Sequence, residues 1–142
     1  AVTQAVLREG VACGVASLMR IGQGNGVIGI GWVAFGTPLQ RTVSSTEAQR
    51  LLMGHVFDDL GYRRLEWKCD ALNAPSMRAA ERLGYTFEGT FRQAVVTKGR
   101  NRDTAWWSIT DAEWPAIREL LDQWLDPSNF DDSGQQRARL SP

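Results

Sequence analysis

A segment rich in hydroxyl side chains lies between a strand-like run and a helix-like pattern: Gln40, Arg41, Thr42, Val43, Ser44, Ser45 and Thr46. The first N–H groups of a helix have no intrahelical partner, and the helix dipole places partial positive charge at the same end. A helix start of this kind binds phosphate and other anions. The segment therefore predicts an anion site, while an ordinary capped helix start is the alternative interpretation.

Asn73 and Ser76 stand three residues apart where a second helix is expected to begin. Pro75, which lies between them, suits the first turn of a helix because its missing N–H has no partner there in any case. Asn and Ser are both typical of helix N-termini. The spacing alone is thus explained by helix capping.

Two other candidate sites are rejected by their context. The run from Gly24 to Gly29 matches G-x-G-x-x-G, but it joins two strand-like segments, whereas a dinucleotide fingerprint opens a helix. His55 is the only histidine, and Cys13 and Cys69 are the only cysteines, which argues against a zinc site built from these residue types. The sequence predicts no metal cofactor.

The elements that must position these residues follow from the spacing of apolar side chains. Strands are expected over residues 5–7, 11–21, 27–35, 65–71, 86–93 and 104–109. Helices are expected over residues 45–60, between Asn73 and Gly84, and from Trp114 onward. The order β-β-β-α-β-α-β-β-α predicts an α/β fold with a central mixed sheet and one parallel crossover.

Each long helix is expected to bury one apolar stripe. In the first helix, which Ser44 and Glu47 would cap, the stripe consists of Ala48, Leu51, Leu52, Val56 and Leu60. In the last helix it consists of Trp114, Ile117, Leu121 and Trp124. Trp106 and Trp107 are adjacent on a strand, so we expect them to face opposite sides of the sheet.

Size and composition fit one domain. The chain has 142 residues and a mass of 15.8 kDa, and we expect a domain over residues 1–125 followed by an irregular tail over residues 126–142. The 16 Lys and Arg balance the 16 Asp and Glu, so no basic field favours nucleic acid or an anionic membrane surface. No apolar run could span a membrane, no signal peptide is visible, and two cysteines favour a cytoplasmic protein.

The start of the chain predicts self-association. There is no initiator Met, and the first residues already have the pattern of a strand rather than of a polar lead-in. We therefore expect that N-terminal elements are missing and that the first strands leave an apolar edge open. Because proteins rarely leave such an edge uncovered, we expect a two-fold homodimer.

The second half of the chain carries a family pattern. Asn73 and Ser76 form N-x-x-S, a helix follows, Leu83-Gly84-Tyr85 matches L-G-F with Tyr in place of Phe, and Glu88-Gly89 and Asp103 complete the pattern. This arrangement resembles the GNAT superfamily of acetyl-CoA-dependent N-acetyltransferases, and within it the branch of ribosomal-protein N-terminal acetyltransferases (RimJ/RimL-like). The loop before the first helix is similar to that family's pyrophosphate loop, although Val43 and Ser45 replace its usual glycines, so Val43 would need a permissive φ.

The resemblance, which spans residues 11 to about 114, implies a three-layer GNAT-like fold. Two parallel strands, one ending at Phe35 and the other over residues 65–71, would splay apart beyond their carboxyl ends, and acetyl-CoA would bind in the crevice. The pantetheine arm would pair with Ala34 and Phe35, and Asn73 would contact it in addition to capping its helix. The pyrophosphate would lie on Gln40, Arg41, Thr42, Val43, Ser44, Ser45 and Thr46.

The resemblance also assigns the chemistry. The tyrosine that many relatives use to protonate the leaving thiolate is replaced by Ala80, and Ser76 is the alternative proton donor, with helix capping as its competing role. The positions where the family can have a general base are occupied by Gly29 and Val95, which cannot accept a proton. The base is therefore unresolved among the remaining carboxylates, which are Glu66, Asp70, Glu88 and Asp103. Asp103 has a hairpin-supporting role as its simpler explanation.

Two functions are consistent with this pattern. The first is an N-acetyltransferase that moves the acetyl group of acetyl-CoA to a primary amine, either a protein N-terminus or a small molecule. The second is a non-catalytic acyl-CoA-binding or interaction module on the same fold. The missing tyrosine and the glycine-poor loop favour the second, whereas the N-x-x-S element and the crevice favour the first.

Overall fold

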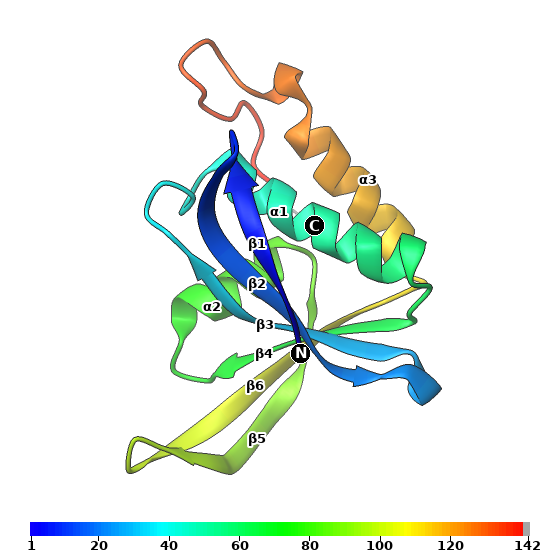
Figure 1. The fold of residues 1–142 in the computed structure, drawn as a ribbon, viewed down its shortest axis with the longest axis vertical. Helices are drawn as coiled ribbons and strands as arrows, with labels where there is room; N and C mark the ends of the chain where they lie inside the picture. Colours follow the sequence, from blue (N-terminus) through cyan, green and yellow to red (C-terminus); the bar gives the residue numbers. More distant parts are fainter. Residues whose placement is uncertain (141–142) are drawn as a thin grey trace.

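The computed structural model describes residues 1–140 and contains six strands and three α-helices in the expected order (Figure 1). The strands are β1 (Val2–Arg8), β2 (Val11–Gly22), β3 (Val27–Phe35), β4 (Arg64–Asp70), β5 (Thr86–Thr97) and β6 (Arg100–Thr110). The helices are α1 (Val43–Gly54), α2 (Ala74–Arg82) and α3 (Trp114–Leu125). No helix of this described part is long and apolar enough to cross a membrane.

The sheet has the strand order β1-β2-β3-β4-β6-β5, and β3 and β4 are its parallel neighbours. They pair only over Val27–Ile30 and Arg64–Trp67, although β3 continues to Phe35 and β4 to Asp70. The two strands therefore separate beyond Ile30 and Trp67, so the expected splay is present but begins within both strands rather than beyond their ends.

A bulge marks the separated half of β3. The register with β2 shifts between Val15 and Ser17, and Trp32 on the opposite strand has a φ of 47°. A positive φ is strained for a bulky side chain. Trp32 is also 74% exposed, so packing does not explain why it holds this conformation.

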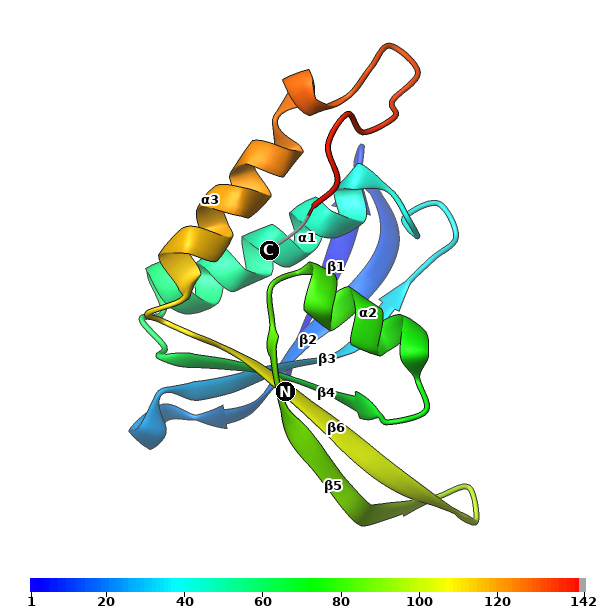
Figure 2. The same ribbon diagram turned by 180° about the vertical axis from the view of Figure 1, so that it is seen from behind.

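The three helices cover one face of the sheet (Figures 1 and 2). The core between them and the sheet includes alternate residues of neighbouring strands, among them Ile28, Leu65, Trp67, Trp107 and Ile109. Trp107 faces this core, and its neighbour on the strand faces the opposite side, as the alternation predicts. The buried stripe of α3 is confirmed at all four expected positions: Trp114, Ile117, Leu121 and Trp124.

The stripe expected for the first helix is wrong in part. Leu52 and Val56 are buried, but Leu51 is 64% exposed beside a groove next to β1, and Leu60 is 47% exposed. The helix passes from α1 into a π-helical turn over His55–Asp59, whose wider hydrogen-bonded ring changes the phase of the side chains that follow. Leu60 is therefore turned toward the surface.

The L-G motif at the end of α2 has a structural explanation. Gly84 has a φ of 97°, and a Cβ at this position would lie 3.1 Å from Cγ1 of Ile117 in α3. Glycine thus both ends the helix and lets α3 approach.

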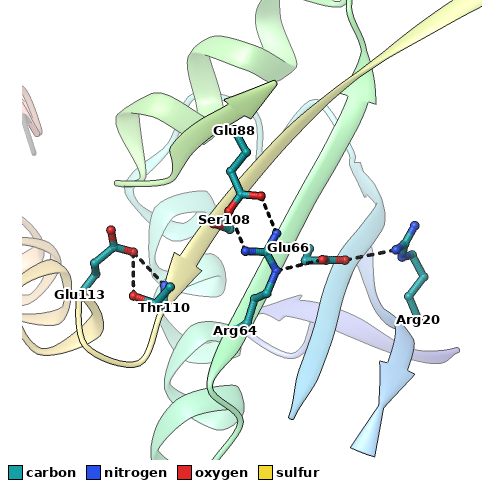
Figure 3. Close-up of polar contacts among 7 residues, drawn as sticks. All are labelled: Arg20, Arg64, Glu66, Glu88, Ser108, Thr110 and Glu113. Atoms are coloured by element: carbon teal, nitrogen blue, oxygen red, sulfur yellow. Dashed lines mark hydrogen bonds and ion pairs between the residues drawn. The ribbon is translucent and has the colours of Figure 1, made fainter. Parts of the chain in front are cut away.

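The Glu88-Gly89 motif also supports the fold. Glu88 on β5 reaches across β6 and accepts two hydrogen bonds from Arg64 on β4, at 2.6 and 2.7 Å, and a third from Ser108 (Figure 3). Arg64 also donates to Glu66 at 3.0 Å, and Glu66 in turn pairs with Arg20 at 3.4 Å. The bonds from Arg64 and Ser108 lower the pKa of Glu88 to about 2.

The C-terminal segment from residue 126 to 140 folds back along α1 and α3. It is irregular apart from a 3₁₀ turn over Pro127–Asn129 and one β-bridge between Phe130 and Gln136. The Asn129 side chain donates to the Trp124 carbonyl at 2.9 Å and accepts from the Ala138 N–H at 2.9 Å. This segment forms one wall of a cavity in front of the start of α1.

Candidate active site

A cavity of about 600 Å³ opens where β3 and β4 separate. Its walls come from both strands, from the first two turns of α1 and from α2. Side chains of both faces of the sheet line it: Trp67 and Cys69 belong to the helix-covered face, whereas Lys68 points to the other. The opening therefore connects the two faces of the sheet.

Ser76 lies in this cavity at the start of α2, and its hydroxyl is held by Trp67. The Trp67 Nε1–H donates to Ser76 Oγ at 3.0 Å, and the Ser76 N–H donates to Asn73 Oδ1 at 3.2 Å. Because the hydroxyl oxygen accepts from the indole, its own proton is left for another acceptor. Burial raises the pKa of the neighbouring Cys69 thiol, which keeps that thiol neutral.

Gln49 contributes an unpartnered acceptor to the same cavity. The residue is buried, and within residues 1–140 its Oε1 atom has no hydrogen-bond partner. An unpaired buried amide oxygen is costly unless a ligand supplies the donor. An amide N–H of a bound pantetheine arm is a donor of the required type, so this residue fits acetyl-CoA.

The start of α1 differs from the expected start at residue 45. The helix begins at Val43, and Thr42 is the N-cap, with its Oγ1 accepting from the Ser45 N–H at 3.3 Å. The proposed capping box of Ser44 and Glu47 is therefore wrong, because the cap lies two residues earlier. The Ser45 N–H also donates to the Thr42 carbonyl at 3.2 Å, so the earliest helical N–H groups, those of Val43 and Ser44, are the better anion donors.

Strain in this loop falls on a residue other than the one expected. Arg41 has a φ of 58°, whereas Val43 has no positive φ and begins the helix. The expectation that Val43 needs a permissive φ is therefore wrong. A valine at the first helical position keeps its N–H, so the replacement of the family's glycine does not remove a donor.

A second cavity, of about 660 Å³, lies in front of this helix start. Its lining includes Arg8, Arg41 and Arg82, and Phe130 and Gln136 of the C-terminal segment form its far wall. Ser45, Thr46 and Arg82 line both cavities, so the two are adjacent, and together they are called the groove.

Arg82 of α2 joins the two parts of the groove. Its guanidinium donates to Thr46 Oγ1 at 3.0 Å and lies 4.8 Å from the centroid of the Trp124 ring. Burial lowers the pKa of Arg82, but an arginine keeps its charge. The contacts with Thr46 and Trp124 thus hold a positive charge beside the start of α1.

The structure brings together most of the residues singled out in the sequence. One or both cavities are lined by Phe35, Arg41, Thr42, Val43, Ser44, Ser45, Thr46, Asn73 and Ser76. Ala34 and Gln40 line neither of them. The Gln40 side chain instead donates to the Phe35 carbonyl at 2.7 Å, which fixes the turn that follows β3.

The four candidate carboxylates are all engaged. Glu66 and Glu88 both form ion pairs with Arg64. Asp70 accepts a hydrogen bond from Arg100 at 3.3 Å. Asp103 accepts hydrogen bonds from the Gln93 N–H at 2.7 Å and from the side chain of Asn101. The hydrogen bond from Gln93 lowers the pKa of Asp103. The hairpin-supporting role of Asp103 is thereby confirmed, and the geometry designates none of the four as a general base.

Several groove residues were missed in the sequence: Gln49, Trp67, Arg82, Trp124 and Phe130. Gln49 lies one turn after the hydroxyl-rich segment, so its polarity on a buried helix face was a usable signal. The others come from different elements, and only the fold brings them together.

Comparison with known proteins agrees with this geometry. A family model described as "Acetyltransferase (GNAT) domain" matches residues 1–86. A GCN5-related N-acetyltransferase from Brucella melitensis is 55% identical with a TM-score of 0.90, over 91% of this chain and 58% of its own. A probable GNAT-family acetyltransferase from Chromobacterium violaceum ATCC 12472 is 50% identical with a TM-score of 0.71, over 73% of this chain and 52% of its own.

A curated relative from Bacillus subtilis (strain 168), named "Putative ribosomal N-acetyltransferase YdaF", is 29% identical over 110 residues. That match covers 77% of this chain and 59% of the relative. The chain thus spans between half and three fifths of the length of these relatives. The family model, the splayed strands and the groove that ends at a helix start agree, and the chain belongs to the GNAT acetyltransferase family.

Proposed function

We propose that this protein transfers the acetyl group of acetyl-CoA to a primary amine. The observation that carries the proposal is the pair of adjacent cavities, one at the splayed strands and the other at a helix N-terminus flanked by arginines. A long ligand with a phosphorylated end and a thioester end has the shape and charge pattern that this groove requires.

The residues of the groove fit the two ends of acetyl-CoA. Arg41, Arg82 and the N–H groups of Val43 and Ser44 would hold the pyrophosphate. Gln49 and Asn73 would hold the pantetheine arm. When bound, acetyl-CoA supplies a thioester carbonyl that an amine can attack.

Ser76 is proposed to donate its hydroxyl proton to the departing thiolate. The hydrogen bond from Trp67 supports this role, since the Ser76 oxygen acts as its acceptor and the hydroxyl proton stays available to a second acceptor. No carboxylate of the crevice is free to act as a base, so water is proposed to carry the amine proton to solvent, and positioning is proposed to supply much of the rate.

The acceptor is proposed to be a protein N-terminus. The Bacillus subtilis relative is named as a putative ribosomal N-acetyltransferase, and the N-x-x-S element is the sequence feature that supports the same branch. The alternative is a non-catalytic acyl-CoA-binding module, which Ala80 at the family's tyrosine position and the engaged carboxylates favour.

The test of cofactor binding uses Val43→Pro. Proline suits the first helical position, and Thr42 before it has the extended conformation that proline requires, so the fold should persist while one N–H donor is lost. We expect the dissociation constant of acetyl-CoA, measured by calorimetry, to rise about tenfold, or about 1.4 kcal/mol. Val43→Ala keeps the N–H and is the control; equal affinity of the two variants would remove the pyrophosphate from this helix start.

Turnover is tested by release of free CoA with a panel of peptide amines. Ser76→Ala should lower kcat by about 10- to 1000-fold and leave the affinity for acetyl-CoA unchanged, because the proton is needed only in the transition state. Binding of acetyl-CoA without turnover on any amine would favour the non-catalytic module.

A further inference from the structure

Two cations face the crevice from the side of the sheet opposite the helices. Lys68 is the first residue of β4 beyond the last pair with β3, and it points away from the core because Trp67 and Cys69 point into it. Arg102 of β6 lines the same cavity. Both therefore lie where the opening between β3 and β4 reaches the other face of the sheet.

Neither cation is neutralised within residues 1–140, where Lys68 and Arg102 form no ion pair and the buried Nε of Arg102 has no hydrogen-bond partner. Asp70, the carboxylate nearest in the lining, accepts from Arg100 and from the Leu72 N–H. Burial, then the positive charges of Arg20 and Arg102, lower the pKa of Lys68, and the negative charge of Glu66 offsets part of this effect.

Trp106 holds this positive charge in place. The Arg20 guanidinium lies 4.5 Å from the centroid of the Trp106 ring, and Lys68 Nζ lies 5.6 Å from it. A cation over an indole face is attracted by the ring. Arg20 is already paired with Glu66, so Lys68 and Arg102 are the cations left to meet a ligand.

The position of the cofactor decides what that ligand is. On the proposed function, acetyl-CoA enters from the helix-covered face, because the helix start and its arginines lie there. The amine must then reach the thioester from the other face, past Lys68 and Arg102. We propose that the acceptor carries a carboxylate or phosphate close to its amine, and that Lys68 and Arg102 bind this anionic group.

Two physical effects support this acceptor class. An acceptor with a second positive charge, such as a polyamine, is repelled by the two cations, whereas an anionic group beside the amine forms charge-assisted hydrogen bonds with them. The same cations favour the neutral form of a nearby amine, which is the form that attacks a thioester. The positive charges of Lys68 and Arg102 thus favour an anionic acceptor and also favour the neutral, reactive form of its amine.

The experiment compares three amides that differ in one side chain: Ala-Asp, Ala-Asn and Ala-Lys dipeptide amides. We expect kcat/KM for Ala-Asp to exceed that for Ala-Asn by about tenfold, with Ala-Lys the poorest. The double variant Lys68→Met with Arg102→Gln should bring the three substrates to similar values, and Lys68→Glu should favour Ala-Lys. Lys98→Met, in the exposed turn after β5, is the control and should keep the wild-type order.

Calorimetry with acetyl-CoA on the same proteins distinguishes whether Lys68 and Arg102 bind the acceptor or the phosphates of the cofactor. If the two cations bind the acceptor, the affinity for acetyl-CoA is unchanged in the double variant; a tenfold loss would assign them to the cofactor phosphates and overturn the proposal. Equal kcat/KM for Ala-Asp and Ala-Asn in the wild type would overturn it as well.

Binding is measured in parallel on the protein saturated with CoA, so the proposal does not depend on turnover. Stronger binding of Ala-Asp than of Ala-Asn, lost in the double variant, supports the anionic acceptor site even if no amine is acetylated, in which case the catalytic proposal alone fails. Equal binding of the two peptides would count against the acceptor class and leave cofactor binding intact.

Discussion

The indole N–H of Trp67 donates to the hydroxyl oxygen of Ser76 at 3.0 Å, and the role of this bond can be tested by removing the N–H. Trp67→Phe removes the N–H and keeps an aromatic ring in the core. We expect kcat to fall about three- to tenfold with little change in KM for acetyl-CoA, because one neutral hydrogen bond contributes about 1 kcal/mol. Steady-state kinetics provide the measurement.

Trp107→Phe is the matched control. Trp107 pairs with Trp67 across β4 and β6, is equally buried at 8% exposure, and its Nε1 has no hydrogen-bond partner within residues 1–140. Its replacement should leave kcat unchanged. In the background of Ser76→Ala, Trp67→Phe should have no further effect on kcat; an additive loss would show that the indole acts elsewhere.

At the scale of residues, the sequence identified the groups that sit on loops and helix starts but not those that come from the core. Ser76 and Asn73 were candidates because they match the N-x-x-S pattern of the family that the chain resembles, since their spacing alone is explained by helix capping. Trp67 and Arg82 could not be identified, because a core indole or a helix-surface arginine joins a site only through the packing of distant elements.

At the scale of elements, the bulge in β3 holds Trp32 in a conformation that glycine adopts without strain. In an ordinary strand Gly is less stable than Ala, but at a φ of 47° the order should reverse. We expect the Trp32→Gly variant to be more stable than the Trp32→Ala variant, with a free energy of unfolding about 1 kcal/mol higher. Chemical denaturation of the two variants measures this difference, and Ala as the more stable residue would contradict a left-handed backbone at this bulge.

The contact between Glu88 and Arg64 ties β5 to β4 and makes stability depend on pH. A carboxyl whose pKa is lowered to about 2, from 4.5, stabilises the fold above pH 4.5, and this contribution is lost as the pH falls toward 2. Glu88→Gln should therefore lower the unfolding free energy at pH 7 and make its decline below pH 5 shallower. Glu81→Gln on the surface of α2 is the control, and parallel pH curves for wild type and Glu88→Gln would contradict the prediction.

The order of the elements and the stripe of α3 were predictable because each follows from local periodicity and chain connectivity, whereas the splay was expected only from the family resemblance. The phase of the first helix was not, since the π-helical turn over His55–Asp59 is a tertiary adjustment with no sequence signal. The start of α1 at Val43 was missed for a related reason: Thr42, Ser44 and Ser45 are all good N-caps, and only the fold selects among them.

At the scale of the whole molecule, β1 forms one edge of the sheet and carries exposed apolar side chains together with β2: Val2, Leu7, Val11, Val15 and Ile21. We expect two copies to associate through this surface, because an uncovered apolar strand edge favours pairing. Light scattering at micromolar concentration should give about twice 15.8 kDa. Val11→Lys should yield the monomer, and a wild-type mass near 15.8 kDa would contradict the prediction.

The short pairing between β3 and β4 has a consequence for how the molecule opens. Only Val27–Ile30 and Arg64–Trp67 join a half-sheet of β1, β2 and β3 to a half-sheet of β4, β6 and β5. The first half continues into the start of α1, where the pyrophosphate is proposed to bind, and the second into Asn73 and Ser76. A cofactor that touches both halves would stabilise their junction by mass action, so its binding would make the two halves of the sheet open together rather than apart.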